Sequence, residues 1–225
     1  MDSDFSAMAR RVGLASAASV LVLAGAYAVA LVWGLASLSS PDQPIANPMF
    51  TIMEVLIILL MPAMVALMAA VHVWAPRSAK VLSLIALIFM GLVAGLTSSL
   101  HFVILTLSRQ AAFADPGWVT LVLSFKWPSI AYALDILAWD VFFSLAMLFA
   151  APVFGGSRLA LTIRWTMVAS GVLAFVGLGG AFTGNMQLRN IGIVGYLGVY
   201  MAVVVLLATL FARARPAAAP TFIKV

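Results

Sequence analysis

Six long runs of apolar residues, separated by short polar segments, dominate the chain. They cover residues 12–38, 49–74, 81–107, 128–151, 161–183 and 191–212. An α-helix needs about 20 consecutive apolar residues to cross the hydrocarbon core of a bilayer, and each run reaches that length. The pattern therefore predicts an all-α integral membrane protein in which six transmembrane helices form a compact bundle.

The segments between the runs complete the predicted organisation. Residues 1–215 are expected to form a single membrane domain, followed by a flexible tail at 216–225. A seventh apolar stretch, Trp118–Phe125, is too short to span a bilayer. We expect it to lie over the bundle as an interfacial or re-entrant segment, because unpaired backbone groups are not tolerated in contact with lipid.

The distribution of lysine and arginine predicts the orientation. If both termini lie on the same side, nine of these residues fall on that side and only Arg109, Lys126 and Arg189 fall on the other. Cytoplasmic loops carry the excess of basic residues in membrane proteins. We therefore predict cytoplasmic N- and C-termini and a location in the plasma membrane, in particular a bacterial inner membrane.

Composition narrows the possible functions. The chain is 65% hydrophobic and 8% charged, and its mean hydropathy of +1.17 is typical of membrane proteins. The net charge of +5 resides mainly in loops, where topology explains it, so we expect no nucleic-acid partner. The absence of cysteine excludes disulfides and thiolate metal sites, and two histidines are too few for a multi-histidine centre. No metal or other cofactor is predicted.

Four of the ionisable residues inside the apolar runs lie toward the same side of the predicted bilayer. Counted from the helix ends, Glu54 lies about one turn deep, while His101 and Asp135 lie about two turns deep. Asp140 is near the midplane. All four fall in the outer half of the predicted bilayer, on three consecutive helices. Ionisable groups at such depths are expensive and usually face protein, water or a ligand, so they define the candidate site.

Helical spacing indicates which neighbours join this site. Tyr132, Asp135 and Trp139 share one stripe of their helix, and Ser98 borders the stripe of His101. Asp135 and Asp140 are five residues apart, which is about 140° around a regular helix. We therefore expect the two aspartates to contact different neighbours rather than to form a carboxylate pair.

The three basic residues on the outer side have two interpretations. Arg109, Lys126 and Arg189 all lie in connections that cap the half of the bundle containing the acids. They are candidates for counter-charges or for a gate above the site. Alternatively, Arg109 and Lys126 extend to the membrane interface beside Trp118 and Trp127, as basic side chains at helix ends often do.

Three classes of function fit these features. The first is a transporter- or channel-like protein that handles a cation, a proton or a small lipophilic ligand at a site open to the outer side. The second is an isomerase-like intramembrane enzyme acting on a lipid or isoprenoid-type substrate, with His101 and an acid transferring protons. The third is a structural or accessory subunit, and an oligomer or a partner subunit remains compatible with all three. The predicted binding residues are Asp140, Asp135, Glu54, His101, Tyr132, Trp139 and Ser98.

Overall fold

The computed structural model describes residues 5–40, 43, 45–113 and 116–215, and this part of the chain is helical with no β-strand. Six of its helices are long and apolar enough to cross a membrane, which confirms the predicted all-α class and the predicted number of helices of this kind. The proposed flexible tail at 216–225 lies outside the described residues.

Several spans are built from more than one helical segment. The first two spans are α1 (Ala7–Ala36) and α2 (Met49–Trp74), and the third joins η1 (Arg77–Ala79) to α3 (Lys80–Leu107). The fourth consists of α5 (Ile130–Ile136), η3 (Leu137–Phe142), α6 (Phe143–Ala150) and η4 (Ala151–Val153). The fifth contains α7 (Arg158–Gly177) and α8 (Gly179–Thr183), and the sixth contains α9 (Arg189–Ile193), η5 (Val194–Val199) and α10 (Tyr200–Arg213).

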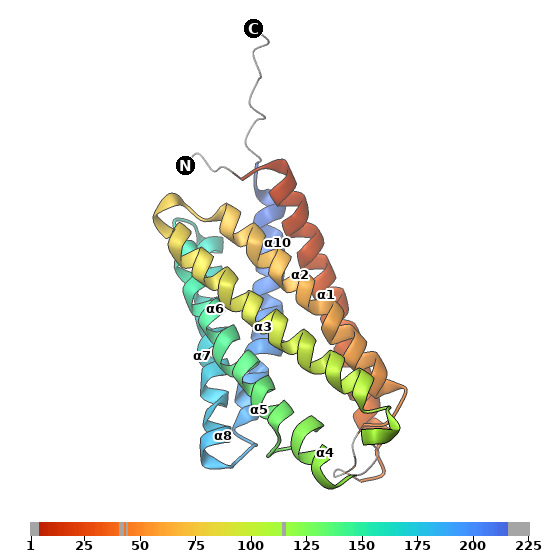
Figure 1. Ribbon diagram of the computed structural model, residues 1–225. Coiled ribbons are helices and arrows are strands. Elements are labelled where there is room, and N and C mark those ends of the chain that lie inside the picture. The colour runs from red at the N-terminus through yellow and green to blue at the C-terminus, as the bar shows by residue number, and fades with distance from the viewer. Residues whose placement is uncertain (1–4, 41–42, 44, 114–115, 216–225) are drawn as a thin grey trace.

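The spans form a ring in which each packs against the next in the chain (Figure 1). The sixth span closes the ring by packing α10 against both α7 and α1. Near the chain ends this closure is tight. The Phe5 ring stacks on the Phe211 ring at 5.3 Å between ring centres and meets the Trp74 ring edge-on at 5.0 Å. Arg10 donates hydrogen bonds to the carbonyls of Phe211 and Ala212 at 2.9 Å. The start of α1 and the end of α10 therefore lie at the same end of the bundle.

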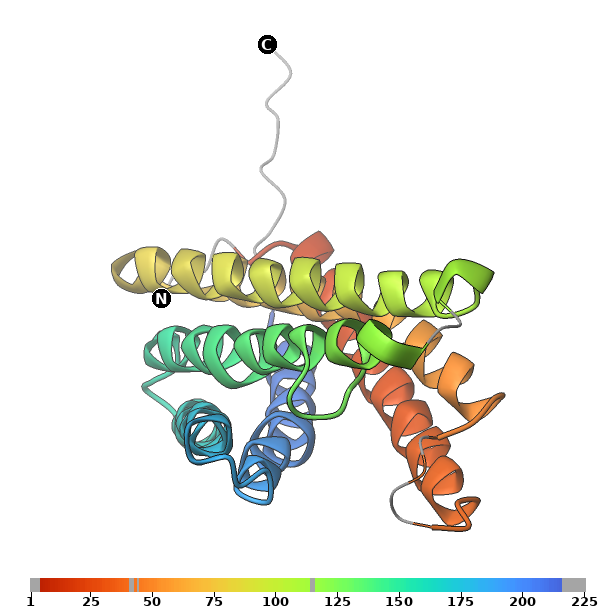
Figure 2. The same cartoon turned by 60° about the horizontal axis from the view of Figure 1, so that its bottom comes forward.

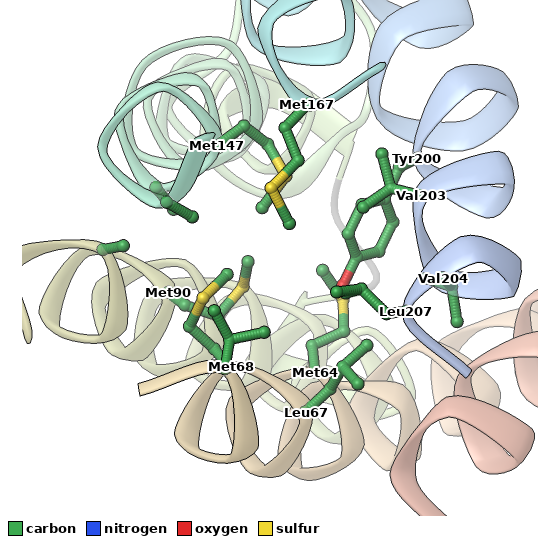
Figure 3. Close-up of a cluster of buried hydrophobic side chains, with 14 of the residues drawn as sticks. Met64, Leu67, Met68, Met90, Met147, Met167, Tyr200, Val203, Val204 and Leu207 are labelled. Atoms are coloured by element: carbon green, nitrogen blue, oxygen red, sulfur yellow. The ribbon is translucent and has the colours of Figure 1, made fainter. Parts of the chain in front are cut away.

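A methionine-rich core fills the half of the ring nearest this end. Met64, Met68, Met90, Met147 and Met167 come from four different helices and converge on the same volume (Figure 3). Methionine has a flexible, unbranched side chain that fills irregular gaps. The core holds the six helices together at one end and leaves the opposite end to be shaped by other side chains.

The opposite end of the bundle carries the longest connection. It contains η2 (Ala111–Phe113) and α4 (Pro116–Leu123), an eight-residue helix that lies beside α5 (Figure 1; Figure 2). Leu123 and Phe125 pack against a small apolar cluster that includes Leu100 and Ile104 of α3. The stretch predicted to be too short to span is thus a short helix and a linker against the bundle.

Candidate functional site

A cavity of about 1020 Å³ occupies the half of the bundle away from the termini. Figure 2 shows α1 and α2 diverging from α10 at this end, and residues of these helices form opposite walls of the cavity. The linker between α4 and α5 and the connection between α1 and α2 contribute to its mouth. The lining includes seven aromatic side chains: Tyr27, Phe50, Phe125, Tyr132, Trp139, Tyr196 and Tyr200.

The cavity is a long slot with its charged groups toward one end. Along α2 the lining runs from Phe50 to Met64, which corresponds to roughly 21 Å at 1.5 Å per residue. Glu54 lies near the mouth, whereas Leu60 and Met64 line the deep end. The slot therefore offers polar groups at the level of the mouth and hydrocarbon surface below it.

Glu54 and His101 form a buried pair on one wall. The Nδ1 atom of His101 lies 2.8 Å from Oε2 of Glu54, and both side chains are almost fully buried. Phe125 stacks on the imidazole at a centroid distance of 4.9 Å. No described residue offers a hydrogen bond to the other ring nitrogen, Nε2. When Glu54 accepts a hydrogen bond from Nδ1–H, Nε2 of a neutral imidazole is left as an acceptor toward the cavity.

Arg189 organises the facing wall. Its Nη2 donates to Oδ2 of Asp135 at 2.7 Å, and its Nε donates to Oδ2 of Asp140 at 3.2 Å. The guanidinium carbon lies 4.4 Å from the centre of the Tyr132 ring, in the position of a cation–π contact. One guanidinium thus holds two carboxylates and an aromatic ring in fixed positions, and it is itself buried.

The expectation that Asp135 and Asp140 contact different neighbours is wrong, and the local helix geometry explains why. η3 is a π-helical turn, in which Phe143 N–H bonds to the carbonyl of Ala138. Hydrogen bonds in a π-helix connect residues five apart, so residues at that spacing lie on the same side. The angle of about 140° applies only to a regular α-helix. The π turn brings both aspartates to one guanidinium.

A second π-helical turn, η5, lies on the sixth span beside α7. Its Gly195 carbonyl accepts a hydrogen bond from the Ser170 hydroxyl at 2.9 Å, and in η3 the Asp140 carbonyl accepts one from Ser144 at 2.7 Å. Hydroxyl side chains satisfy backbone carbonyls in this way where transmembrane helices are irregular. Two irregular turns therefore flank Arg189, and π turns in membrane and soluble helices often occur at functional sites.

Two glycines make room for the Asp140 carboxylate. A Cβ atom on Gly192 would lie 2.5 Å from Oδ1 of Asp140, and one on Gly177 would lie 2.9 Å from it. Asp140 is wholly buried, and its Oδ1 has no hydrogen-bond partner in the described part of the chain. The glycines allow the fifth and sixth spans to approach closely around this carboxylate.

This close packing predicts that Gly192→Ala destabilises the protein. The added methyl group would overlap the Asp140 carboxylate and the Gly177 backbone, so we expect a loss of about 1–3 kcal/mol in the free energy of unfolding. Gly198→Ala is a matched control on the same span, since a Cβ there meets only a Val194 methyl group at 3.9 Å. Thermal unfolding in detergent measures both, and equal melting temperatures for the two variants would contradict the packing argument.

The remaining predicted site residues occupy different places. Tyr132, Trp139 and Lys126 line the cavity, and Lys126 is exposed at its mouth. Ser98 is half-buried and lies outside the lining. Arg109 also lies outside it, on the surface, where its guanidinium hydrogen-bonds the Thr51 hydroxyl. Of the three basic residues predicted for the outer side, Arg189 is the one that pairs with an acid among the described residues, and its partners are Asp135 and Asp140.

Several lining residues were missed from the sequence. Tyr27 on α1 and the pair Tyr196 and Tyr200 on the sixth span line the cavity, although no site residue is predicted on either span. Tyr196 and Tyr200 are four residues apart, which places two aromatic rings on one helix face. Trp139 contacts Tyr196 at 5.2 Å between ring centres, so these aromatic groups form one continuous wall.

Comparison with known proteins assigns neither a family nor a function to this chain. The chain matches no protein-family model, no curated protein and no solved structure. Among the described residues, no group of three or more His, Asp or Glu side chains is placed to hold a metal ion. Interpretation of the site therefore depends on its own geometry.

Proposed function

We propose that this protein binds a small lipophilic molecule in the slot between the first three spans and the fourth and sixth spans, and handles it in the manner of a membrane carrier. The observation that carries this proposal is the cavity itself, whose volume of about 1020 Å³ and mainly apolar, aromatic lining resemble sites for small organic ligands. With both termini in the cytoplasm, as the basic residues predict, the mouth of the slot would face the outer side.

The pairing of the acids favours an organic ligand over a bare inorganic cation. Glu54 contacts His101, and Asp135 and Asp140 both contact Arg189. A dehydrated metal or alkali cation needs several free oxygen ligands arranged around it. Here the carboxylates are already engaged in charge-assisted hydrogen bonds, and Asp140 lies behind Arg189 rather than on the cavity surface. Its contacts are those of a residue that positions Arg189.

Filling the slot tests the proposal. Ile57 lines the cavity on α2, so Ile57→Trp should occupy the space that a ligand requires. Val55→Trp is the matched control, because Val55 lies on the same helix but is exposed on its outer surface. We expect octanol at submillimolar concentration to raise the melting temperature of the wild-type protein and of Val55→Trp in lipid nanodiscs, since a ligand that binds the folded state stabilises it.

The Ile57→Trp variant should lose this thermal shift while remaining folded. Native mass spectrometry of protein purified from membranes provides a second measurement, with an added lipophilic mass expected for the wild type and Val55→Trp alone. An identical response of all three proteins to octanol, with no added mass in any of them, would overturn the proposed ligand site.

An intramembrane enzyme is the second candidate, and the Glu54–His101 pair favours it. A carboxylate that fixes one ring nitrogen of a histidine while the other faces a cavity is the usual arrangement of a positioned general base. A lipid or isoprenoid-type substrate in the slot would place its polar end near this nitrogen. Under this alternative, His101→Gln would abolish turnover of a bound lipid while ligand binding and the melting temperature persist.

A further inference from the structure

We infer that the ligand of this slot is an amphiphile with a positively charged, organic ammonium-type headgroup and a hydrocarbon chain. This inference rests on the proposed function, because it specifies what the same cavity binds. Three features of the cavity carry it: the balance of its charges, the position of those charges along its length, and the aromatic side chains around them.

The charged groups that line the slot, together with the Asp140 carboxylate buried behind Arg189, leave an excess of negative charge. The single positive charge of Arg189 faces two carboxylates, Asp135 and Asp140. With the carboxylates ionised and His101 neutral, Glu54 and this cluster together carry a formal charge of −2, and Lys126 at the exposed rim reduces the total to −1. Because interactions between charges are strong away from water, a cationic headgroup complements this wall and an anionic headgroup opposes it.

Aromatic rings surround the same level of the slot. Tyr132 and Phe125 lie beside the two charged pairs, as their contacts with Arg189 and His101 show. Tyr27, Trp139 and Tyr196 complete the lining there. Ring faces attract cations, and arrangements of several aromatic side chains are the established way in which proteins bind quaternary ammonium groups. The Tyr132 ring already makes this kind of contact with a guanidinium.

The deep end of the slot defines the rest of the ligand. Leu60, Met64 and Met201 present hydrocarbon and thioether surface below the charged level. Glu54 and Met64 are ten residues apart on α2, which corresponds to roughly 15 Å. An extended alkyl chain of eight carbons, together with its headgroup, fits within this length. Methionine side chains adjust to ligands of different shape, which suits a chain without fixed branching.

Three amphiphiles that share an alkyl chain of the same length but differ in headgroup charge test the inferred headgroup. Octyltrimethylammonium, octanol and octanoate carry positive, neutral and negative heads on eight-carbon chains, and all can be used below micellar concentrations. Binding is measured from thermal shifts of the protein in nanodiscs of neutral lipid, with Ile57→Trp as the baseline for effects on the bilayer. We expect octyltrimethylammonium to bind wild type at least about tenfold more tightly than octanoate, with octanol between them.

Isosteric variants then test which carboxylates cause the preference for a cationic headgroup. Asp135→Asn and Glu54→Gln each remove one negative charge from the lining and keep a hydrogen-bonding oxygen, so each should reduce the ratio of cation to anion affinity. Equal binding of the three amphiphiles to wild type would overturn the headgroup inference and leave the ligand site standing. Tighter binding of octanoate would overturn it as well. If none of the three amphiphiles raises the melting temperature of the wild type more than that of Ile57→Trp, the ligand site itself is overturned.

Discussion

Replacing Arg189 with leucine is expected to destabilise the protein by about 3–5 kcal/mol, because it leaves two buried carboxylates without their common partner. Asp140 has no exposed surface and Asp135 has little, so water cannot replace the lost hydrogen bonds of either group. Removing one member of a buried ion cluster costs more than the cluster contributes, since the remaining charges keep their desolvation penalty. The free energy of unfolding, measured in detergent micelles under conditions chosen for reversible refolding, checks this value.

Two further variants separate charge from packing. Arg189→Lys keeps a positive charge but lacks the planar fork that reaches both carboxylates, so we expect a smaller loss than for leucine. Adding Asp135→Asn and Asp140→Asn to Arg189→Leu removes the unpaired charges, and most of the lost stability should return. A triple variant as unstable as Arg189→Leu would show that the guanidinium acts through its shape and volume, and would contradict the electrostatic account.

The fold was largely predictable because bilayer physics imposes a length and a hydropathy on each span. The six apolar runs correspond to the six spans, and the bounds differ by only a few residues, as where the first helix begins at Ala7 rather than at residue 12. The stretch Trp118–Phe125 was correctly separated from the spans by its length. The side of the membrane occupied by each end stays a prediction, since it depends on the distribution of basic residues alone.

The residues of the candidate site were easier to predict from the sequence than the contacts between their side chains. Glu54 and His101 were assigned to neighbouring helices at similar depth, and the structure brings them within 2.8 Å. The joint contact of Asp135 and Asp140 with Arg189 was missed, because the angular count assumed regular α-helix through both residues. A π turn shifts the helix by one residue, and no glycine or proline lies between the two aspartates to signal it. Tyrosines on the first and sixth spans were missed because aromatic residues at helical spacing are ordinary in membrane cores.

Substituting both members of the Glu54–His101 pair is expected to separate stability from function. Glu54→Leu alone leaves His101 with a buried, unsatisfied Nδ1–H and should cost about 1–3 kcal/mol. The double variant Glu54→Leu/His101→Phe replaces the pair with apolar groups of similar size, and a phenyl ring at position 101 can keep the stacking contact with Phe125. We expect its unfolding free energy to return to the wild-type value or to exceed it, as it often does when a buried polar pair is replaced by apolar groups.

The same double variant should lose most of the preference of the slot for octyltrimethylammonium, because one of the two carboxylates that line the cavity is gone. His101→Phe by itself is the informative control: it leaves Glu54 unpaired beside the cavity, so it should lower stability while cation affinity is retained or increased. A buried acid and histidine that can be removed without loss of stability contribute nothing essential to folding, and their cost is then explained by what they bind or protonate. If the double variant is instead unstable and its ligand affinities match those of wild type, the pair serves helix packing, and the chemistry of the slot resides in Asp135 and Arg189.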